Sequence, residues 1–282
     1  MKKSLGLKIC AGLLAVPILG TFCRGAFATT NSILKVGVED IYPGTAETKK
    51  SNEDGTATYD KATKALTLKG YTGKAIDTDI DTLIINVTED SKITDTVKTL
   101  HSAGNVTING SKKLTLSNGI DVEGSFTLES ANIDLGTTDL TAKGKISING
   151  AIKAGSISLT AADITKGKIM FGEKADVNVS KDITANYTSK VSQLGIELNK
   201  VCANAKIINI NNTGKTATTT TVFSTDNTTG VTKGVKISSA LCEDKGTNDK
   251  VNPDTADGIY FYVAALVASS AILVYRRHLA KR

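Results

Sequence analysis

Residue types that support catalysis are scarce in this chain. It has no tryptophan and only two histidines, and His101 is the one that lies outside the basic C-terminal tip. All the arginines lie near the ends, at positions 24, 276, 277 and 282. A zinc site with two or three histidines is therefore excluded between the ends, and a histidine-activated nucleophile would depend on His101 alone. We expect no enzyme; the alternative is a carbohydrate-active enzyme that uses two carboxylates.

The N-terminal segment has the pattern of a secretory signal peptide. A basic start, an apolar run and a cleavage site of small residues follow one another: Lys2, Lys3 and Lys8, then residues 9–19, then Ala26 and Ala28. The apolar run is shorter than the roughly 20 residues of a membrane span. The sequence therefore predicts that residues 1–28 are a signal peptide, cleaved after Ala28, and that the protein is exported.

The C-terminal segment has the pattern of a single membrane span. Residues 259–275 are apolar and have tyrosines near both ends, and Arg276 and Arg277 follow directly. Amphipathic rings favour the interface, and basic residues favour the cytoplasmic side. We expect a transmembrane helix over 259–275 that leaves residues 29–258 outside the cell.

A short motif precedes this apolar stretch. It consists of Asn252, Pro253, Asp254, Thr255 and Ala256. Together with the apolar stretch and the basic tip it resembles the sorting signal of Gram-positive surface proteins, whose common form is Leu-Pro-x-Thr-Gly. The resemblance implies that a sortase cuts between Thr255 and Ala256 and joins Thr255 to cell-wall peptidoglycan. Asn252 and Ala256 depart from the common form. The alternative is a single-pass plasma-membrane protein that keeps its span.

The excess of basic over acidic residues lies at the two ends of the chain. The whole chain carries a formal charge of +6. Eight of its 34 basic residues and one of its 28 acidic residues lie outside residues 29–255, which leaves 26 and 27 inside. A segment of charge −1 lacks the positive field that nucleic-acid binding requires. We therefore expect no nucleic-acid partner.

Two cysteines remain after removal of the signal, Cys202 and Cys242. In an exported protein such a pair can form a disulfide, here closing a loop of about 40 residues. The alternative is two unpaired thiols. The sequence leaves both open.

The central segment repeats short strands with one apolar face. Gly104-Asn-Val-Thr-Ile is echoed by Gly124-Ser-Phe-Thr-Leu and by Gly144-Lys-Ile-Ser-Ile, at a regular step of 20 residues. A short strand buries its apolar face only when copies stack on it. The pattern predicts an all-β fold, a right-handed parallel β-helix (a solenoid) of roughly seven short coils over residues 57–210. The alternative is a β-sandwich.

The alternation also predicts which side chains point into the solenoid. They are Val106, Ile108, Leu114, Leu116, Phe126, Leu128, Ile133, Leu135, Ile146, Ile148, Ile157, Leu159, Ile169 and Phe171. Residues 29–56 should form an N-terminal strand and loop, and a turn at Asp60–Thr63 should lead into a strand at Ala65–Leu68. Residues 211–251, rich in threonine and asparagine, are predicted to form a loosely ordered stalk before the sorting signal at 252–282; a short hairpin around Val231 to Leu241 could interrupt this stalk.

The start of this region carries a second resemblance. Residues 33–38 and the motif Tyr59-Asp-Lys-Ala-Thr-Lys-Ala-Leu-Thr-Leu68 resemble exported Firmicutes proteins that continue into a β-helix. Some of these proteins bind carbohydrate, often with calcium, which implies a glycan ligand here. Asp77, Asp79 and Asp81 alternate along the chain, so their carboxylates could point the same way and bind calcium. Apart from such an ion we expect no cofactor.

These features together predict a non-catalytic cell-surface protein that works by adhesion or glycan binding. Its partners would be sortase and peptidoglycan, an extracellular glycan, and the membrane before sorting. The alternative within the same location is a structural wall protein or minor pilus component without a small ligand.

Overall fold

The computed structural model describes residues 33–42, 48–50, 55–212, 218–224 and 234–243. In these ranges the protein is all-β, with 56% of the residues in strands and one short helix, α1 (Ala240–Glu243). No helix there is long and apolar enough to cross a membrane. The predicted signal peptide, sorting motif and C-terminal span lie outside the described residues.

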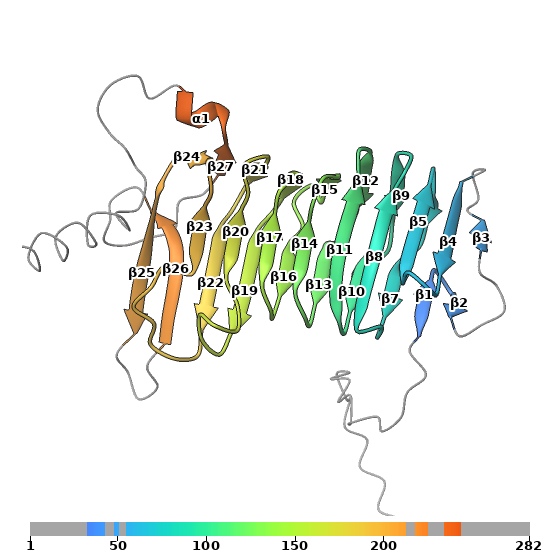
Figure 1. Ribbon diagram of the computed structural model, residues 1–282, viewed down its shortest axis with the longest axis horizontal. Helices are drawn as coiled ribbons and strands as arrows, with labels where there is room; N and C mark the ends of the chain where they lie inside the picture. Colours follow the sequence, from blue (N-terminus) through green and yellow to red (C-terminus); the bar gives the residue numbers. More distant parts are fainter. Residues whose placement is uncertain (1–32, 43–47, 51–54, 213–217, 225–233, 244–282) are drawn as a thin grey trace, which may run out of the picture. The chain divides into compact units, whose positions relative to one another are not determined.

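The strands form three sheets, named here A, B and C, and each is given in spatial order (Figure 1). Sheet A contains β2 (Glu39–Tyr42), β1 (Leu34–Val36), β7 (Ile76–Thr78), β10 (Leu100–Ser102), β13 (Ile120–Val122), β16 (Leu140–Ala142), β19 (Ile157–Ala161), β22 (Ile183–Tyr187), β26 (Thr218–Ser224) and β25 (Lys206–Asn212). Sheet B contains β23 (Ile196–Leu198), β20 (Ile169–Phe171), β17 (Ile146–Ile148), β14 (Phe126–Leu128), β11 (Asn105–Gly110), β8 (Thr82–Val87), β5 (Ala65–Lys69), β4 (Thr56–Asp60) and β3 (Thr48–Lys50). Sheet C contains β24 (Cys202–Ala203), β27 (Val235–Ser238), β21 (Asp176–Val179), β18 (Ala151–Ala154), β15 (Asn132–Asp134), β12 (Lys113–Leu116), β9 (Ser91–Ile93) and β6 (Thr72–Gly73).

The order of the strands along the chain defines a β-solenoid. Each turn supplies one strand to sheet B, one to sheet C and one to sheet A, as β11, β12 and β13 do, and the next turn repeats the path. From β7 to β22 every pairing in sheet A is parallel, over about five turns. The solenoid that we expected is confirmed, and the β-sandwich alternative is wrong.

The number of turns is smaller than the roughly seven expected for residues 57–210. Both ends of that segment leave the coiled path. At its start, β4 and β5 form an antiparallel hairpin. At its end, β25 pairs antiparallel with β26 instead of stacking on the previous coil.

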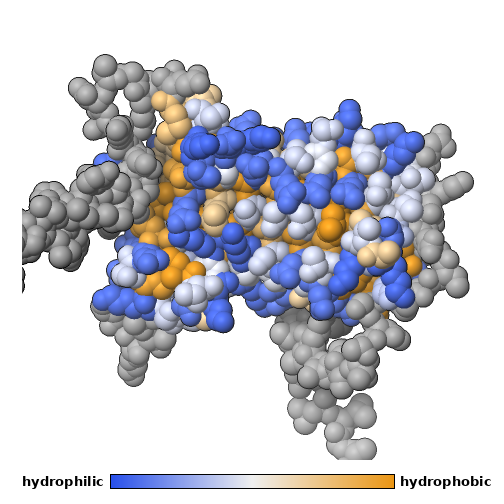
Figure 2. Space-filling model, in the orientation of Figure 1, coloured by the Kyte–Doolittle hydropathy of each residue, from blue (hydrophilic) through white to orange (hydrophobic). Residues whose placement is uncertain are grey.

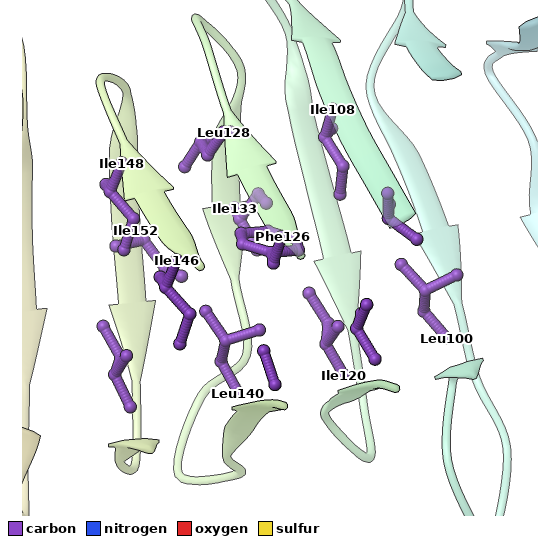
Figure 3. Close-up of a cluster of buried hydrophobic side chains, with 14 of the residues drawn as sticks. Leu100, Ile108, Ile120, Phe126, Leu128, Ile133, Leu140, Ile146, Ile148 and Ile152 are labelled. Atoms are coloured by element: carbon purple, nitrogen blue, oxygen red, sulfur yellow. The ribbon is translucent and has the colours of Figure 1, made fainter. Parts of the chain in front are cut away.

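The 20-residue step becomes a fixed register between coils. Val106 pairs with Phe126, and Phe126 pairs with Ile146, so three equivalent side chains stack inside the solenoid. All fourteen residues predicted to point inward are at most 2% exposed. Figure 3 shows Ile108, Phe126 and Ile146 among the apolar side chains that fill the space between the sheets. Since each such side chain removes its apolar surface from water, stacking copies supplies the core that one strand cannot.

Polar side chains at one corner join successive coils. The Asn105 side-chain oxygen accepts a 2.8 Å hydrogen bond from the backbone N–H of Ser125. The Ser125 hydroxyl oxygen accepts a 3.1 Å hydrogen bond from the backbone N–H of Lys145, one coil further on. These contacts satisfy turn N–H groups that have no strand partner, which explains the asparagine and serine at this point of the repeat.

The N-terminal part agrees with the expected strand–turn–strand. Asp60 ends β4, and its carboxylate accepts hydrogen bonds from the Ala62 N–H at 2.9 Å and the Thr63 hydroxyl at 2.7 Å. The Thr63 hydroxyl contributes most to lowering the pKa of Asp60. The turn leads into β5, as predicted. Where one strand was expected within residues 29–56, the structure has three: β1 and β2, which pair with each other, and β3, which pairs with β4.

The stalk predicted for residues 211–251 is wrong for residues 218–224, and residues 235–238, where a short hairpin was the alternative, form a strand. Strand β26 pairs antiparallel with β22, and its Val222 and Phe223 are at most 1% exposed. Strand β27 pairs with both β21 and β24. The threonines that suggested a stalk are useful in this setting, because the buried hydroxyls of Thr219 and Thr221 accept hydrogen bonds from the Val191 and Gly195 N–H groups, each at 2.9 Å.

Candidate functional site

A column of polar side chains runs across the outer face of sheet A. The register places one residue of each coil beside its equivalent in the next: Asp77, His101, Asp121, Thr141, Ser158 and Thr184. All six are half-buried. We call this set the sheet A column. It contains the only histidine outside the C-terminal tip, with a carboxylate on the strand at either side.

The column forms because the buried residues on either side of each column residue turn its side chain outward. Leu100 and Ser102 are buried on either side of His101, and Ile120 and Val122 are buried on either side of Asp121. Successive residues of a strand point to opposite faces, so burial of the flanking pair turns the central side chain outward. Parallel pairing then stacks the outward residues at ~4.8 Å intervals.

Three hydrogen bonds orient the column. His101 Nδ1 lies 2.8 Å from Asp77 Oδ1, and these side chains are 27% and 46% exposed. The Thr141 hydroxyl donates to Asp121 Oδ1 at 2.6 Å. The Thr184 hydroxyl donates to the Ser158 hydroxyl oxygen at 3.2 Å. Each side chain is thus oriented by a neighbour while part of it still faces water.

The other two sheets present different chemistry. On sheet B the equivalent outward residues Thr107, Thr127 and Ser147 stack as hydroxyl groups without charge. Sheet C carries charged side chains of both signs, and Lys113 Nζ lies 2.7 Å from Asp134 Oδ2. The Lys113 side chain and the Gly136 N–H both hydrogen-bond to Asp134 and hold the pKa of its carboxyl below the usual range, the lysine most strongly. In Figure 2 hydrophilic and intermediate residues cover most of the visible face of the middle coils.

The structure does not bring the three predicted calcium ligands together. Asp77 pairs with His101, and Asp79 Oδ1 accepts a hydrogen bond from the Ile33 N–H. Asp81 binds the next coil through its backbone, since its carbonyl oxygen accepts from the Asn105 N–H at 2.7 Å. Among the residues that the structure describes, no group of three or more histidine, cysteine or acidic side chains could hold a metal ion. Calcium binding stays a prediction from the sequence.

The structure has the disulfide that was one of the two alternatives for the cysteines. Cys202 lies in β24 and Cys242 in α1, their Cα atoms are 5.1 Å apart, and the bond joins residues 40 positions apart in the chain. The bond therefore ties the helix to the last strands of sheet C.

Three tyrosines pack near the first coil. Tyr59 and Tyr71, at the first coil, are 6% and 2% exposed. The rings of Tyr42 and Tyr59 meet at a centroid distance of 5.7 Å, and Lys61 Nζ lies 5.1 Å from the Tyr42 centroid. Burial, the largest influence, raises the pKa of Tyr59. These rings complete the end of the core.

Sequence reasoning treated His101 only as an isolated residue and did not place it beside Asp121. The signal for the pair was present, because His101 and Asp121 are 20 residues apart, as are Asp121 and Thr141. That is the step of the glycine repeat. The partner Asp77 was harder to find, since it precedes His101 by 24 residues. The predicted sites at Ala26 and Ala28, and at residues 252–256, lie outside the described residues.

Comparison with known proteins gave no assignment. No protein-family model, no curated protein and no solved structure matches the chain.

Proposed function

We propose that this chain is an exported, non-catalytic surface protein of a Gram-positive bacterium, and that its solenoid binds an extracellular glycan. The export and attachment parts of the proposal are supported by sequence: the signal pattern of residues 1–28, and the motif at 252–256 followed by the apolar stretch and basic tip. Sortase and peptidoglycan are the partners that this attachment requires.

The sheet A column is the observation that carries glycan binding. A glycan is a chain of repeated hydroxyl groups, and the column is a row of carboxylate, imidazole and hydroxyl groups repeated at the strand spacing. Carboxylates such as those of Asp77 and Asp121 accept hydrogen bonds from hydroxyl groups, and charge-assisted bonds are the stronger kind. Solenoids present such extended surfaces to long partners.

The orientation of the column also favours binding. His101 is fixed by Asp77, and Asp121 is fixed by Thr141, so less side-chain freedom is lost when a ligand arrives. On sheet C the Asp134 carboxylate is less suited to bind a neutral glycan, because it already pairs with Lys113.

A glycan array measured with the purified protein tests this proposal. The double variant Asp121→Asn, Thr141→Val removes one charge and one hydroxyl from the sheet A column. At about 1 kcal/mol for each lost hydrogen bond, we expect roughly tenfold weaker binding or more. The matched control is Lys92→Gln with Lys153→Gln on sheet C, which should bind as the original protein does. Absence of glycan binding, or equal losses in both variants, would refute the proposal.

The same glycans test the alternative enzyme. An enzyme that uses two carboxylates would release new reducing ends from a bound polysaccharide. We expect none to appear, and release that is lost in Asp121→Asn would replace the binding proposal by hydrolysis.

Attachment to the wall has its own test. Mass spectrometry of protein released from cell walls by a peptidoglycan hydrolase should find a C-terminus at Thr255 that carries wall-peptide mass. If residues 256–282 are retained and the protein fractionates with membranes, the single-pass membrane alternative is correct.

A further inference from the structure

The C-terminal end of the solenoid is closed by strands that run against the coils. Strand β26 pairs antiparallel with β22, β25 pairs antiparallel with β26, and β27 pairs antiparallel with β21 and β24. We call β25, β26, β27 and α1 the C-terminal cap. It covers the last coil, and buried residues such as Phe223 and Ile237 belong to the same core as the coils.

The Cys202–Cys242 disulfide brackets the cap. Cys202 is the first residue of β24, directly before the cap begins in sequence, and Cys242 lies in α1 at its end. All three strands of the cap therefore lie within the closed loop of residues 203–241. The anchoring residue of the proposed function, Thr255, follows Cys242 by 13 positions.

From this connectivity we infer that the disulfide is a mechanical bypass, which carries tension from the wall attachment directly into β24 and leaves the cap outside the stretched path. Tension follows covalent bonds. Force entering at Thr255 reaches Cys242 first, crosses to Cys202, and continues into the coils, so residues 203–241 are not pulled. The inference rests on the proposed attachment at Thr255 for its biological role, although the force path follows from the bond alone.

The cap needs this protection because the ladders that join it to β22, β21 and β24 have only four, three and two residue pairs. Strand β27 has four residues and pairs with only two residues of β24. Without the disulfide, force would pull β27 from the Ser238 end, which pairs with Cys202, and the ladder would open pair by pair. The rate of unfolding under force is set by the free-energy barrier to opening, and this barrier is low for a ladder whose pairs open one at a time.

Loss of the cap would also remove a strand that supports the candidate site. Thr184, the last residue of the sheet A column, lies on β22, and β26 pairs beside it with Val222 opposite Thr184. Peeling β26 away would leave β22 as an unpaired edge. The bypass thus keeps the face that we assign to glycan binding intact while the protein is under load.

Single-molecule force spectroscopy on the full chain tests the bypass. Pulling handles are inserted after Ala28 and after Thr255. In the oxidised protein we expect no early low-force step, and a fully unfolded length shorter by roughly 130–145 Å, the length of the 40-residue loop at 3.3–3.6 Å per residue. After reduction of the folded protein, or in Cys202→Ser with Cys242→Ser, we expect an early low-force step and the full length.

A second handle position supplies the control. A handle inserted after Asn199 lies before Cys202 in the chain, so the cap is outside the stretched path whether or not the disulfide is present, and the early step should be absent from both forms. An early step in the oxidised protein pulled from Thr255, or none after reduction, would overturn the inference, as would free thiols at Cys202 and Cys242. Since purified protein is pulled, the result is independent of wall attachment, which the mass spectrometry above tests separately.

Discussion

The backbone N–H of Gly144 donates a 2.8 Å hydrogen bond to the carbonyl oxygen of Gly124, at the same corner of the preceding coil. A Cβ on Gly124 would in turn lie 2.7 Å from the carbonyl oxygen of Gly104. The three glycines of the 20-residue repeat therefore stack directly on one another. Glycine is required because the backbones approach too closely at this corner to admit a side chain.

Gly144→Ala should destabilise the solenoid. The added Cβ would lie 2.6 Å from the Ser125 hydroxyl oxygen and 2.8 Å from the Gly124 carbonyl carbon. Overpacking of this kind costs about 1–3 kcal/mol of unfolding free energy, which urea denaturation measures. The control is Gly136→Asn: no atom lies within 4 Å of a Cβ there, and asparagine tolerates the φ of +60°. Equal urea midpoints for both variants would contradict the stacking argument.

Phe126→Ala should be the more severe change, because it opens a cavity in the middle of the stack. Phe126 is 0% exposed and lies between Val106 and Ile146 on the adjacent coils. Replacement of a buried phenylalanine by alanine costs about 3–5 kcal/mol. The next residue, Thr127, faces outward, and Thr127→Ala should stay within about 0.5 kcal/mol of the original protein. Thermal unfolding that falls equally in both would show that Phe126 is not a core residue.

The coils were predictable from sequence because their signal is local and repeated. The step from Gly104 to Gly124 to Gly144 fixes the coil length, and alternation within each strand fixes which residues are buried. Other coils differ in length, since Leu140 pairs with Ile157, 17 residues on, and Ile169 pairs with Ile196, 27 residues on. The differences in length lie in the turns and leave the parallel pairing of the strands unchanged.

The cap and the candidate site depended on information that no single stretch contains. Residues 218–224 form a strand because β22 offers an open edge and an uncovered core, which composition cannot reveal. A run of threonines suits such a strand and suits a stalk equally well. Likewise, Asp77 meets His101 only because a 24-residue coil stacks in register with its neighbours. In both cases the structure depends on which strands pair in the folded protein, and the local sequence does not determine that pairing.

The Lys113–Asp134 pair on sheet C should stabilise the protein only above the pH at which Asp134 becomes protonated. The hydrogen bond from Lys113 lowers the pKa of Asp134 below the usual value of 3.8. A lowered carboxyl pKa adds stability that is present above the ordinary pKa and is lost as pH falls through the lowered one. Asp134→Asn should cost up to about 1 kcal/mol at pH 7. The difference from the original protein should disappear in urea titrations at the lowest pH.

Lys113→Gln provides the partner variant for this pair. It should remove most of the same stabilisation and raise the pKa of Asp134, which NMR titration of the side-chain carboxyl measures. Additive losses in the double variant would mean that the two side chains contribute independently, and the explanation for the lowered pKa would then be wrong.

Tyr187 should make the protein sensitive to alkaline pH. Its hydroxyl donates a 3.0 Å hydrogen bond to the carbonyl oxygen of Gly167, the side chain is 2% exposed, and burial raises the pKa of Tyr187 from 10.0 to about 12. The unfolded chain ionises first, so the stability due to this group is complete below pH 10 and declines as pH rises through about 12. Tyr187→Phe removes both the hydrogen bond and the ionisation. We expect it to be about 1 kcal/mol less stable at pH 8, and to lose less stability than the original protein between pH 10 and 12.

Lysines titrate in the same range, so the informative quantity is the difference between the two proteins. Parallel alkaline unfolding curves would show that Tyr187 ionises as readily in the folded protein as in the unfolded chain, which its burial against the Gly167 carbonyl oxygen argues against.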